Sequence, residues 1–238
     1  MSYFDAIYVI NLPSRSDRRA QMNEQLRKVG LDPQAPPVRF FDAVRPDDAG
    51  GFPTLGTRGC FLSHLGVMRA AHAAGHQRVL VLEDDLNFSK DFVQRIGPLA
   101  QAAETMGWDF WYLSALSVKS PPSEKGDLVK LSPDSAVFGA HMFAVRAPVI
   151  EQLIPYLEAM LARQPGDPAG GPMHVDGAYS WYRMQHPAVR TIMATQALGY
   201  QRPSRTDIHA LKWFDRVPVV DKAVGLLRGL RAHLAGRH

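Results

Sequence analysis

Three adjacent carboxylates, Glu83-Asp84-Asp85, follow directly after an apolar run and are the strongest candidates for chemistry in this chain. The run, Val79-Leu80-Val81-Leu82, lacks polar alternation, which is typical of a strand covered on both faces, as in a parallel sheet. Ligands of open α/β sheets bind at the carboxyl ends of the strands. In extended backbone, Glu83 and Asp85 would point to one side and Asp84 to the other. Two such carboxylates suit a hard cation, Mg²⁺ or Mn²⁺, that bridges to phosphate oxygens.

The alternative is that these acids only cap the helix expected near Asp91 or face solvent. Three neighbouring carboxylates repel one another, however, and something must offset that repulsion. We therefore favour the metal site.

The elements that would position this site alternate between strands and helices along the chain. Ile7–Ile10 predicts a buried strand, and Ser14 or Ser16 would cap the helix that ends at Gly30. This alternation predicts an α/β fold with a mainly parallel sheet flanked by helices. Further strands are expected near 38–41, 79–82, 111–113, 137–145 and 191–195, and further helices near 60–74, 91–103, 148–162 and 176–184.

Composition predicts one soluble domain with a tail. The chain has 238 residues and a single cysteine, Cys60, so it forms no intramolecular disulfide and fits a reducing compartment. Neither a secretory signal nor a stretch of 18 apolar residues is evident, which favours a cytoplasmic location. The net charge of +4 equals that of residues 216–238 alone, so residues 1–215 are neutral and a nucleic-acid partner is not expected. We expect a domain over 1–215 and a basic helical tail over 216–238.

Three segments, in this order, resemble motifs of glycosyltransferase family 25. They are Ile7–Met22 (IYVINLPSRSDRRAQM), Gly59–Leu65 (GCFLSHL) and Val79–Phe88 (VLVLEDDLNF). That family includes bacterial enzymes of lipooligosaccharide synthesis and is related to the collagen galactosyltransferases. The resemblance covers about the first 90 residues and thins beyond residue 100.

The resemblance implies a GT-A-like fold, a Mn²⁺ or Mg²⁺ cofactor, and inverting transfer of a hexose, such as galactose, from a UDP-sugar to a glycan or glycolipid. In this mapping Glu83 and Asp85 are the metal-site acids. It places these side chains with the nucleotide sugar: Asn11, Arg15, Arg18, His64 and Asp84. Arginine suits phosphate because its planar fork donates several hydrogen bonds. For Arg18 a solvated helix face is the alternative.

Asp176 is the candidate catalytic base. Inverting transfer requires a group that accepts the proton of the attacking hydroxyl, and Asp176 matches a late acidic position of the family. The alternative is a helix N-cap, which aspartate also favours. His64 has a structural alternative too, because a histidine beside an apolar helix face is more often packed than catalytic. Cys60, at the expected helix start, is interpreted as a packing residue.

Later positions resemble the family less closely. Gly139-Ala140-His141-Met142 departs from the family pattern, which leaves the donor sugar open. The segment 201–208 is similar to a closing motif. In it Arg202 and Arg205 would contact the diphosphate, while Asp207 or His209 would complete the metal shell. A surface loop is the alternative for this Pro/Ser/Arg-rich stretch.

The tail and the function each keep a rival interpretation. The tail's basic residues and its imperfect apolar stripe fit a helix on the inner face of a membrane or one packed on its own domain. Besides a glycosyltransferase, the chain would fit a non-catalytic nucleotide-sugar or carbohydrate-binding protein. A sugar nucleotidyltransferase is disfavoured because Asn11-Leu12-Pro13-Ser14 is not a Gly-rich phosphate loop.

Overall fold

The computed structural model describes residues 3–121 and 126–202, and it contains a central seven-stranded sheet. In spatial order its strands are β2 (Val38–Asp42), β1 (Ala6–Asn11), β3 (Arg78–Glu83), β9 (Met142–Arg146), β5 (Phe110–Ser114), β10 (Thr191–Ala194) and β7 (Leu128–Leu131). Strands β2, β1, β3, β5 and β10 run in one direction, whereas β9 and β7 run in the other. The expected mainly parallel α/β sheet is therefore confirmed, with an antiparallel strand beside β3.

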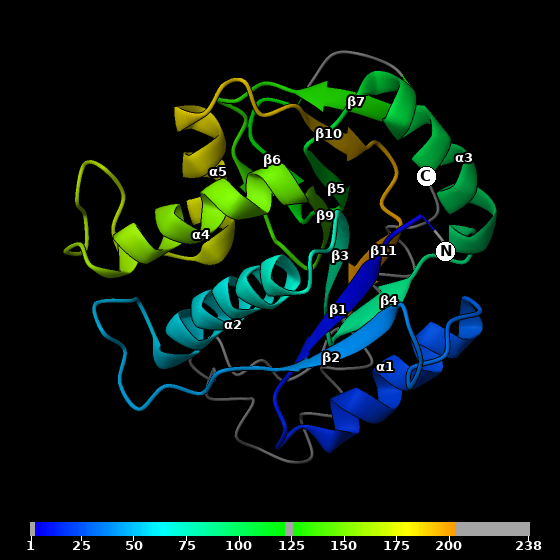
Figure 1. The fold of residues 1–238 in the computed structure, drawn as a ribbon, viewed down its shortest axis with the longest axis horizontal. Coiled ribbons are helices and arrows are strands. Elements are labelled where there is room, and N and C mark those ends of the chain that lie inside the picture. The colour runs from blue at the N-terminus through cyan, green and yellow to red at the C-terminus, as the bar shows by residue number, and fades with distance from the viewer. Residues whose placement is uncertain (1–2, 122–125, 203–238) are drawn as a thin grey trace, which may run out of the picture.

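Within the described residues, five helices cover the two faces of the sheet. They are α1 (Ser16–Lys28), α2 (Leu55–Ala73), α3 (Phe92–Met106), α4 (Ala147–Leu161) and α5 (Val175–Gln185). One face packs against α2, α4 and α5, and the other against α1 and α3. Figure 1 shows the sheet between these two groups of helices. Two short antiparallel pairs complete the described fold: β4 (Leu86–Phe88) with β11 (Gly199–Gln201), and β6 (Ser117–Val118) with β8 (Val137–Phe138).

The central strands are apolar on both sides because both faces of the sheet are covered. In β3, Val79 and Val81 belong to the core under α2, α4 and α5, whereas Leu80 and Leu82 belong to the core under α1 and α3. All four side chains are fully buried. The unbroken apolar run thus corresponds to a strand between two helical layers, as expected.

Several sequence predictions about element boundaries are wrong. Helix α2 begins at Leu55 rather than near residue 60, because the side chain of Thr54 caps it by accepting a hydrogen bond from the Thr57 amide at 3.0 Å. Arg15 occupies the N-cap of α1 and no side chain caps that helix. The single strand expected over 137–145 divides into β8 and β9, which are separated by a non-strand segment around Gly139.

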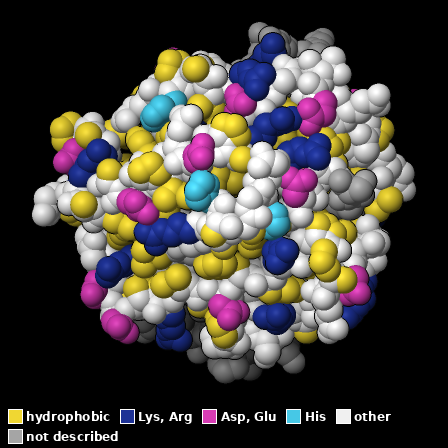
Figure 2. All heavy atoms as spheres, in the orientation of Figure 1, with side chains coloured by type: hydrophobic (Ala, Val, Ile, Leu, Met, Phe, Trp, Pro, Cys, Tyr) yellow, Lys and Arg dark blue, Asp and Glu magenta, His cyan; other side chains and the backbone are white. Residues whose placement is uncertain are grey.

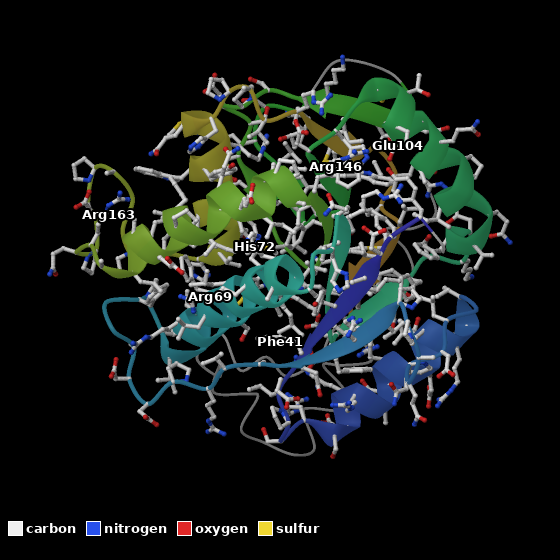
Figure 3. All side chains as sticks on the ribbon, in the orientation of Figure 1. Phe41, Arg69, His72, Glu104, Arg146 and Arg163 are labelled. Carbon is white, nitrogen blue, oxygen red and sulfur yellow. The ribbon has the colours of Figure 1, made fainter. Side chains whose placement is uncertain are left out.

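Helix α2 approaches its neighbours closely at two glycines. A Cβ atom at Gly59 would lie 2.7 Å from the backbone oxygen of Val44, and one at Gly66 would lie 2.4 Å from the ring of Phe41. On its other side α2 is joined to α4 by Arg69, whose Nη2 donates to Glu158 at 2.8 Å (Figure 3). Glycine in the interior of α2 therefore permits a tight approach that fixes the helix carrying Cys60 and His64.

Basic, acidic and apolar side chains are interspersed over the face that carries α2 and α4 (Figure 2). Among the described helices, none has the length and apolarity to cross a membrane. The basic tail, residues 216–238, lies outside the described residues.

Replacing Gly59 by Ala should lower the melting temperature. The added Cβ would meet a backbone oxygen, which cannot move as a flexible side chain could, and overpacking of this kind costs about 1–3 kcal/mol. Gly97→Ala is the matched control, since Gly97 lies within α3 with open space around it. Alanine there should change stability by less than about 1 kcal/mol, because its gain in helix propensity is offset by crowding against the following Pro98. Equal shifts in differential scanning calorimetry would contradict the close approach of α2.

Candidate active site

A pocket of about 670 Å³ lies at the edge of the sheet where the parallel strands end. The segments that follow β1, β2, β3 and β5 contribute to its wall. Because β9 runs in the opposite direction, its preceding segment, rather than its end, reaches the same edge. The first turn of α5 faces the pocket as well. This is the edge at which open α/β sheets bind ligands.

Glu83 is the last residue of β3 and faces the α2 side of the pocket. Its Oε2 accepts a hydrogen bond from Gln201 at 2.9 Å. Its Oε1 lies 3.7 Å from Nε2 of His64, beyond hydrogen-bond distance. Burial raises the pKa of Glu83, but His64, His141 and Gln201 lower it by more, so the pKa lies below its usual value. Glu83 is therefore a carboxylate at neutral pH.

Asp84 is buried and turned toward α1. Its Oδ2 accepts from Asn11 at 2.7 Å and its Oδ1 accepts from Arg18 at 2.9 Å. Asn11 and Arg18 are themselves buried. The alternative that Arg18 lies on a solvated helix face is therefore wrong. Asp84 thus anchors the segment Glu83-Asp84-Asp85, called the acidic turn below, to β1 and α1.

The ionised form of Asp85 is disfavoured by its surroundings in the pocket. Burial and the neighbouring Glu83 raise its pKa to about 7, while Arg18, 3.8 Å away, lowers it. Among the described residues, its buried Oδ1 has no hydrogen-bond partner. Asp84 and Asp85 form a turn rather than a continuation of β3, so the alternation expected for extended backbone stops at Asp84. Both Glu83 and Asp85 nevertheless line the pocket.

Arg202 clamps the acidic turn. Its Nη2 donates to the backbone oxygen of Asp84 at 2.5 Å, and its Nη1 donates to Leu86 and Asn87. Its own amide donates to the backbone oxygen of Asp85. The expected contact between Arg202 and a diphosphate stays a prediction, but the guanidinium already has a structural role that sequence reasoning missed.

Arg15 also lines the pocket, close to the end of β1. It forms a two-pronged ion pair with Asp17, with both nitrogen–oxygen distances at 2.9 Å. With Arg18, it gives the pocket wall two guanidinium groups on the α1 side. The expected site residues Arg205, Asp207 and His209 lie outside the described residues.

Asp176, in the first turn of α5, also lines the pocket. His174 occupies the N-cap, so the alternative that Asp176 is itself the N-cap is wrong. Its Oδ2 accepts from the amide of Gly139 and its Oδ1 from the amide of Gly177, both at 2.8 Å. These two bonds fix the carboxylate in the pocket wall.

One polar stripe of α5 ties the segment 132–139 to the helix. Ser180 accepts from the amide of Val137 at 3.1 Å. Arg183, fully buried, donates to the backbone oxygens of Ser132 and Ser135. Together with Asp176 these side chains position the segment that enters the pocket at Gly139.

His64 is fully buried and also borders the pocket. Its ring stacks on Phe143, with centroids 5.8 Å apart, and its Nδ1 lies 3.1 Å from the hydroxyl of Tyr179. Cys60 lies one turn before it, in the interior of α2 rather than at its start, and also borders the pocket. Burial, reinforced by Glu83 and Asp176, raises the pKa of the Cys60 thiol well above its usual value.

His141 is a buried polar residue that the sequence analysis did not assign. Its Nε2 lies 2.8 Å from the hydroxyl of Ser114, which donates to the backbone oxygen of Gly199 at 2.6 Å. The single hydroxyl proton is thereby used, so Nε2 of His141 is the donor to Ser114. Burial lowers the pKa of His141. Only the departure from the family pattern at 139–142 pointed to this position.

The family model of glycosyltransferase family 25, described as an LPS biosynthesis protein, matches residues 4–133, more than half of the chain. The chain belongs to glycosyltransferase family 25. The matched region includes the acidic turn, Asn11, Arg18 and His64, whereas Asp176 and Arg202 lie beyond it. The GT-A-like, mainly parallel sheet that the resemblance implied is confirmed by the strand order.

Curated relatives carry several functional names. A glycosyltransferase 25 family member of Anopheles gambiae is 34% identical over 123 residues, covering 44% of this chain and 21% of the relative. Procollagen galactosyltransferase 1 of Danio rerio is 31% identical, covering 51% and 23%. The inactive family member 3 of Homo sapiens is 30% identical, covering 57% and 25%. The matches thus span about a quarter or less of these longer proteins.

Solved structures resemble the fold at low identity. A glycosyltransferase involved in glycosylation of the major capsid of PBCV-1 has a TM-score of 0.49 at 10% identity, covering 84% of this chain and 94% of that one.

Replacing Asp85 by Asn should stabilise the metal-free protein at neutral pH. A carboxyl group whose pKa is raised on folding lowers the free energy of unfolding when it is ionised, and it has no such effect when it is protonated. Its destabilising effect therefore grows as pH rises from about 4 toward about 7. We expect the Asp85→Asn variant, measured with a chelator, to melt about 4 °C or more above wild type at pH 8. The difference should shrink toward pH 4.

The control is Asp47→Asn, which removes an exposed carboxylate that does not line the pocket and should leave the melting temperature unchanged at both pH values. A lower melting temperature for Asp85→Asn at pH 8 would show that Asp85 stabilises the apo fold.

Proposed function

We propose that this chain is a metal-dependent, inverting glycosyltransferase that transfers a hexose from a UDP-sugar to a hydroxyl of a glycan or glycolipid. The observation that carries the proposal is the arrangement of the pocket. A buried acidic turn lies at the carboxyl edge of the sheet, and a second carboxylate, Asp176, faces the same space from α5. Galactose is the proposed sugar, supported by the naming of a relative as a procollagen galactosyltransferase.

The residues present fit a hard divalent cation, Mn²⁺ or Mg²⁺. Glu83 and Asp85 would hold it, because Asp85 has a buried oxygen without a partner among the described residues and a charge that a cation would stabilise. When bound, such a cation supplies Lewis-acid stabilisation of diphosphate charge. Asp84 is used by Asn11 and Arg18, and it supports the turn rather than adding an open ligand.

Asp176 would act on the acceptor. Its carboxylate takes the proton of the acceptor hydroxyl while that oxygen forms a bond to the anomeric carbon. The bond from the anomeric carbon to the diphosphate breaks at the same time, and its electron pair leaves with the diphosphate. Arg15 and Arg18 on the α1 side of the pocket would offset the growing negative charge. Attack from the side opposite the leaving group inverts the anomeric carbon.

A non-catalytic nucleotide-sugar-binding protein is the second candidate, favoured by the relatives named as inactive. In that case the pocket would bind donor and metal without consuming the donor. Donor hydrolysis or transfer that requires Mn²⁺ separates the two candidates.

A thermal-shift panel of nucleotide sugars with and without Mn²⁺ should find a stabilising donor. A ligand at about 100 times its Kd stabilises the fold by about 2.7 kcal/mol, which is several degrees. We expect one UDP-hexose to produce this shift only when Mn²⁺ is present. Glu83→Gln and Asp85→Asn should abolish the Mn²⁺-dependent part. A panel without any Mn²⁺-dependent shift would contradict the proposed donor class.

Replacing Asp176 by Asn should reduce kcat by about 10²–10⁴-fold with little change in donor binding. Asparagine keeps one oxygen, which can still accept from the Gly139 amide, but it loses the bond from the Gly177 amide and cannot accept the hydroxyl proton. Ser180→Ala is the matched control, because it loosens the same segment from α5 without removing a carboxylate. Similar losses in both variants would assign Asp176 a positioning role, and normal turnover of Asp176→Asn would exclude it as the base.

A further inference from the structure

Three potential metal ligands of different chemistry meet on the α2 side of the pocket. Cys60 and His64 are four residues apart on α2 and so lie on one face of the helix, and Glu83 reaches them from the end of β3. The Cys60 sulfur, a His64 ring nitrogen and a Glu83 oxygen all lie within 4.8 Å of one another. All three residues border the pocket. The set shares only Glu83 with the proposed Mn²⁺ ligands.

Nε2 of His64 is directed toward the Glu83 carboxylate, whose Oε1 lies 3.7 Å away. The His64 side chain is fully buried, and among the described residues its Nε2 has no hydrogen-bond partner. The ring cannot turn easily, because it stacks on Phe143 and meets the edge of Tyr179. When a metal takes Nε2, the ring proton lies on Nδ1, where the Tyr179 hydroxyl 3.1 Å away can accept it. Metal-bound histidines commonly have such a partner on their second nitrogen.

The Glu83 carboxylate likewise has one atom held by the protein and one directed toward the proposed metal position. Gln201 holds its Oε2 at 2.9 Å, while Oε1 faces His64 at 3.7 Å. Ligands of a tetrahedral zinc at about 2.0–2.3 Å lie roughly 3.3–3.8 Å apart. The His64–Glu83 separation already has this value, and the sulfur, which lies within 4.8 Å of both other ligand atoms, needs to approach by at most about 1 Å.

The donor set selects the kind of metal. Sulfur and imidazole nitrogen favour Zn²⁺ over Mg²⁺ or Mn²⁺, which prefer oxygen ligands. Three protein ligands with a fourth position open to a pocket are typical of accessible zinc sites.

We propose that Cys60, His64 and Glu83 form a zinc-binding site, and that zinc in this site inhibits the enzyme by taking Glu83 away from the carboxylate pair. Binding converts the Cys60 thiol to a metal-bound thiolate and releases its proton to solvent. The inhibitory half of the proposal rests on the proposed transferase function. The binding half does not.

Cobalt provides a direct test of binding, with Co²⁺ as a spectroscopic substitute for Zn²⁺. Titrating the metal-free full chain should produce a thiolate-to-cobalt charge-transfer band, which Zn²⁺ then abolishes by displacement. Cys60 is the only cysteine, so the band reports this site alone. His64→Gln should weaken Co²⁺ binding by about tenfold or more. His72→Gln, at an exposed position of the same helix (Figure 3), is the matched control and should bind normally.

The absence of the band in the wild-type chain would overturn the proposal. So would an unchanged Co²⁺ affinity in His64→Gln, provided that circular dichroism shows the variant to be folded. Neither outcome depends on catalytic activity, so a failure here is distinct from a failure of the proposed function.

Inhibition is tested in Mn²⁺-supported transfer. Zn²⁺ should inhibit the wild type, and Cys60→Ala should raise the inhibitory Zn²⁺ concentration by about tenfold or more. The Cys60→Ala enzyme should keep its Mn²⁺-supported rate, because the proposed transfer does not use the sulfur. Equal zinc sensitivity of both proteins would overturn the inhibitory role. A cobalt band in a chain without Mn²⁺-dependent donor binding would instead contradict the proposed function and leave the zinc site supported.

Discussion

Two arginines hold the acidic turn together, and the candidate site depends on them. Arg18 binds the carboxylates of Asp84 and, at longer range, Asp85, whereas Arg202 binds the backbone oxygens of the turn. Without these contacts, three successive carboxylates at a buried sheet edge would repel one another and turn toward solvent. The two arginines come from α1 and from the segment after β11, so the turn is held from distant parts of the chain.

The arrangement leaves a negative charge that the protein does not fully balance. Asp84 has two close donors, but Asp85 keeps a buried oxygen without a partner among the described residues and a pKa raised to about 7. Perturbed carboxylates of this kind are common at functional sites, where a ligand supplies the missing partner. The strain is tolerated because β3, which carries the turn, is buried between two helical layers.

Elements with strong local signals were predicted correctly, and those governed by packing were not. The apolar runs of β1 and β3 and the helices α3, α4 and α5 lie close to where the sequence placed them. The start of α2 was missed because the Pro/Gly/Asp-rich stretch before it resembles a loop, and the cap by Thr54 is a single residue. The direction of β9 was not predictable, since its apolar pattern suits a buried strand of either orientation.

The sequence by itself determined the family, the mainly parallel α/β fold, and the acidic turn at the end of a buried strand, because each of these depends on local pattern or on motifs. Only the tertiary structure decided which groups surround that turn. Gln201 lies 118 residues from Glu83, and Arg18 lies 66 residues from Asp84, yet each is within hydrogen-bond distance. Pairing and desolvation of charges depend on distances that the chain acquires only on folding, so the partners of Glu83, Asp85 and His64 became visible only in the structure.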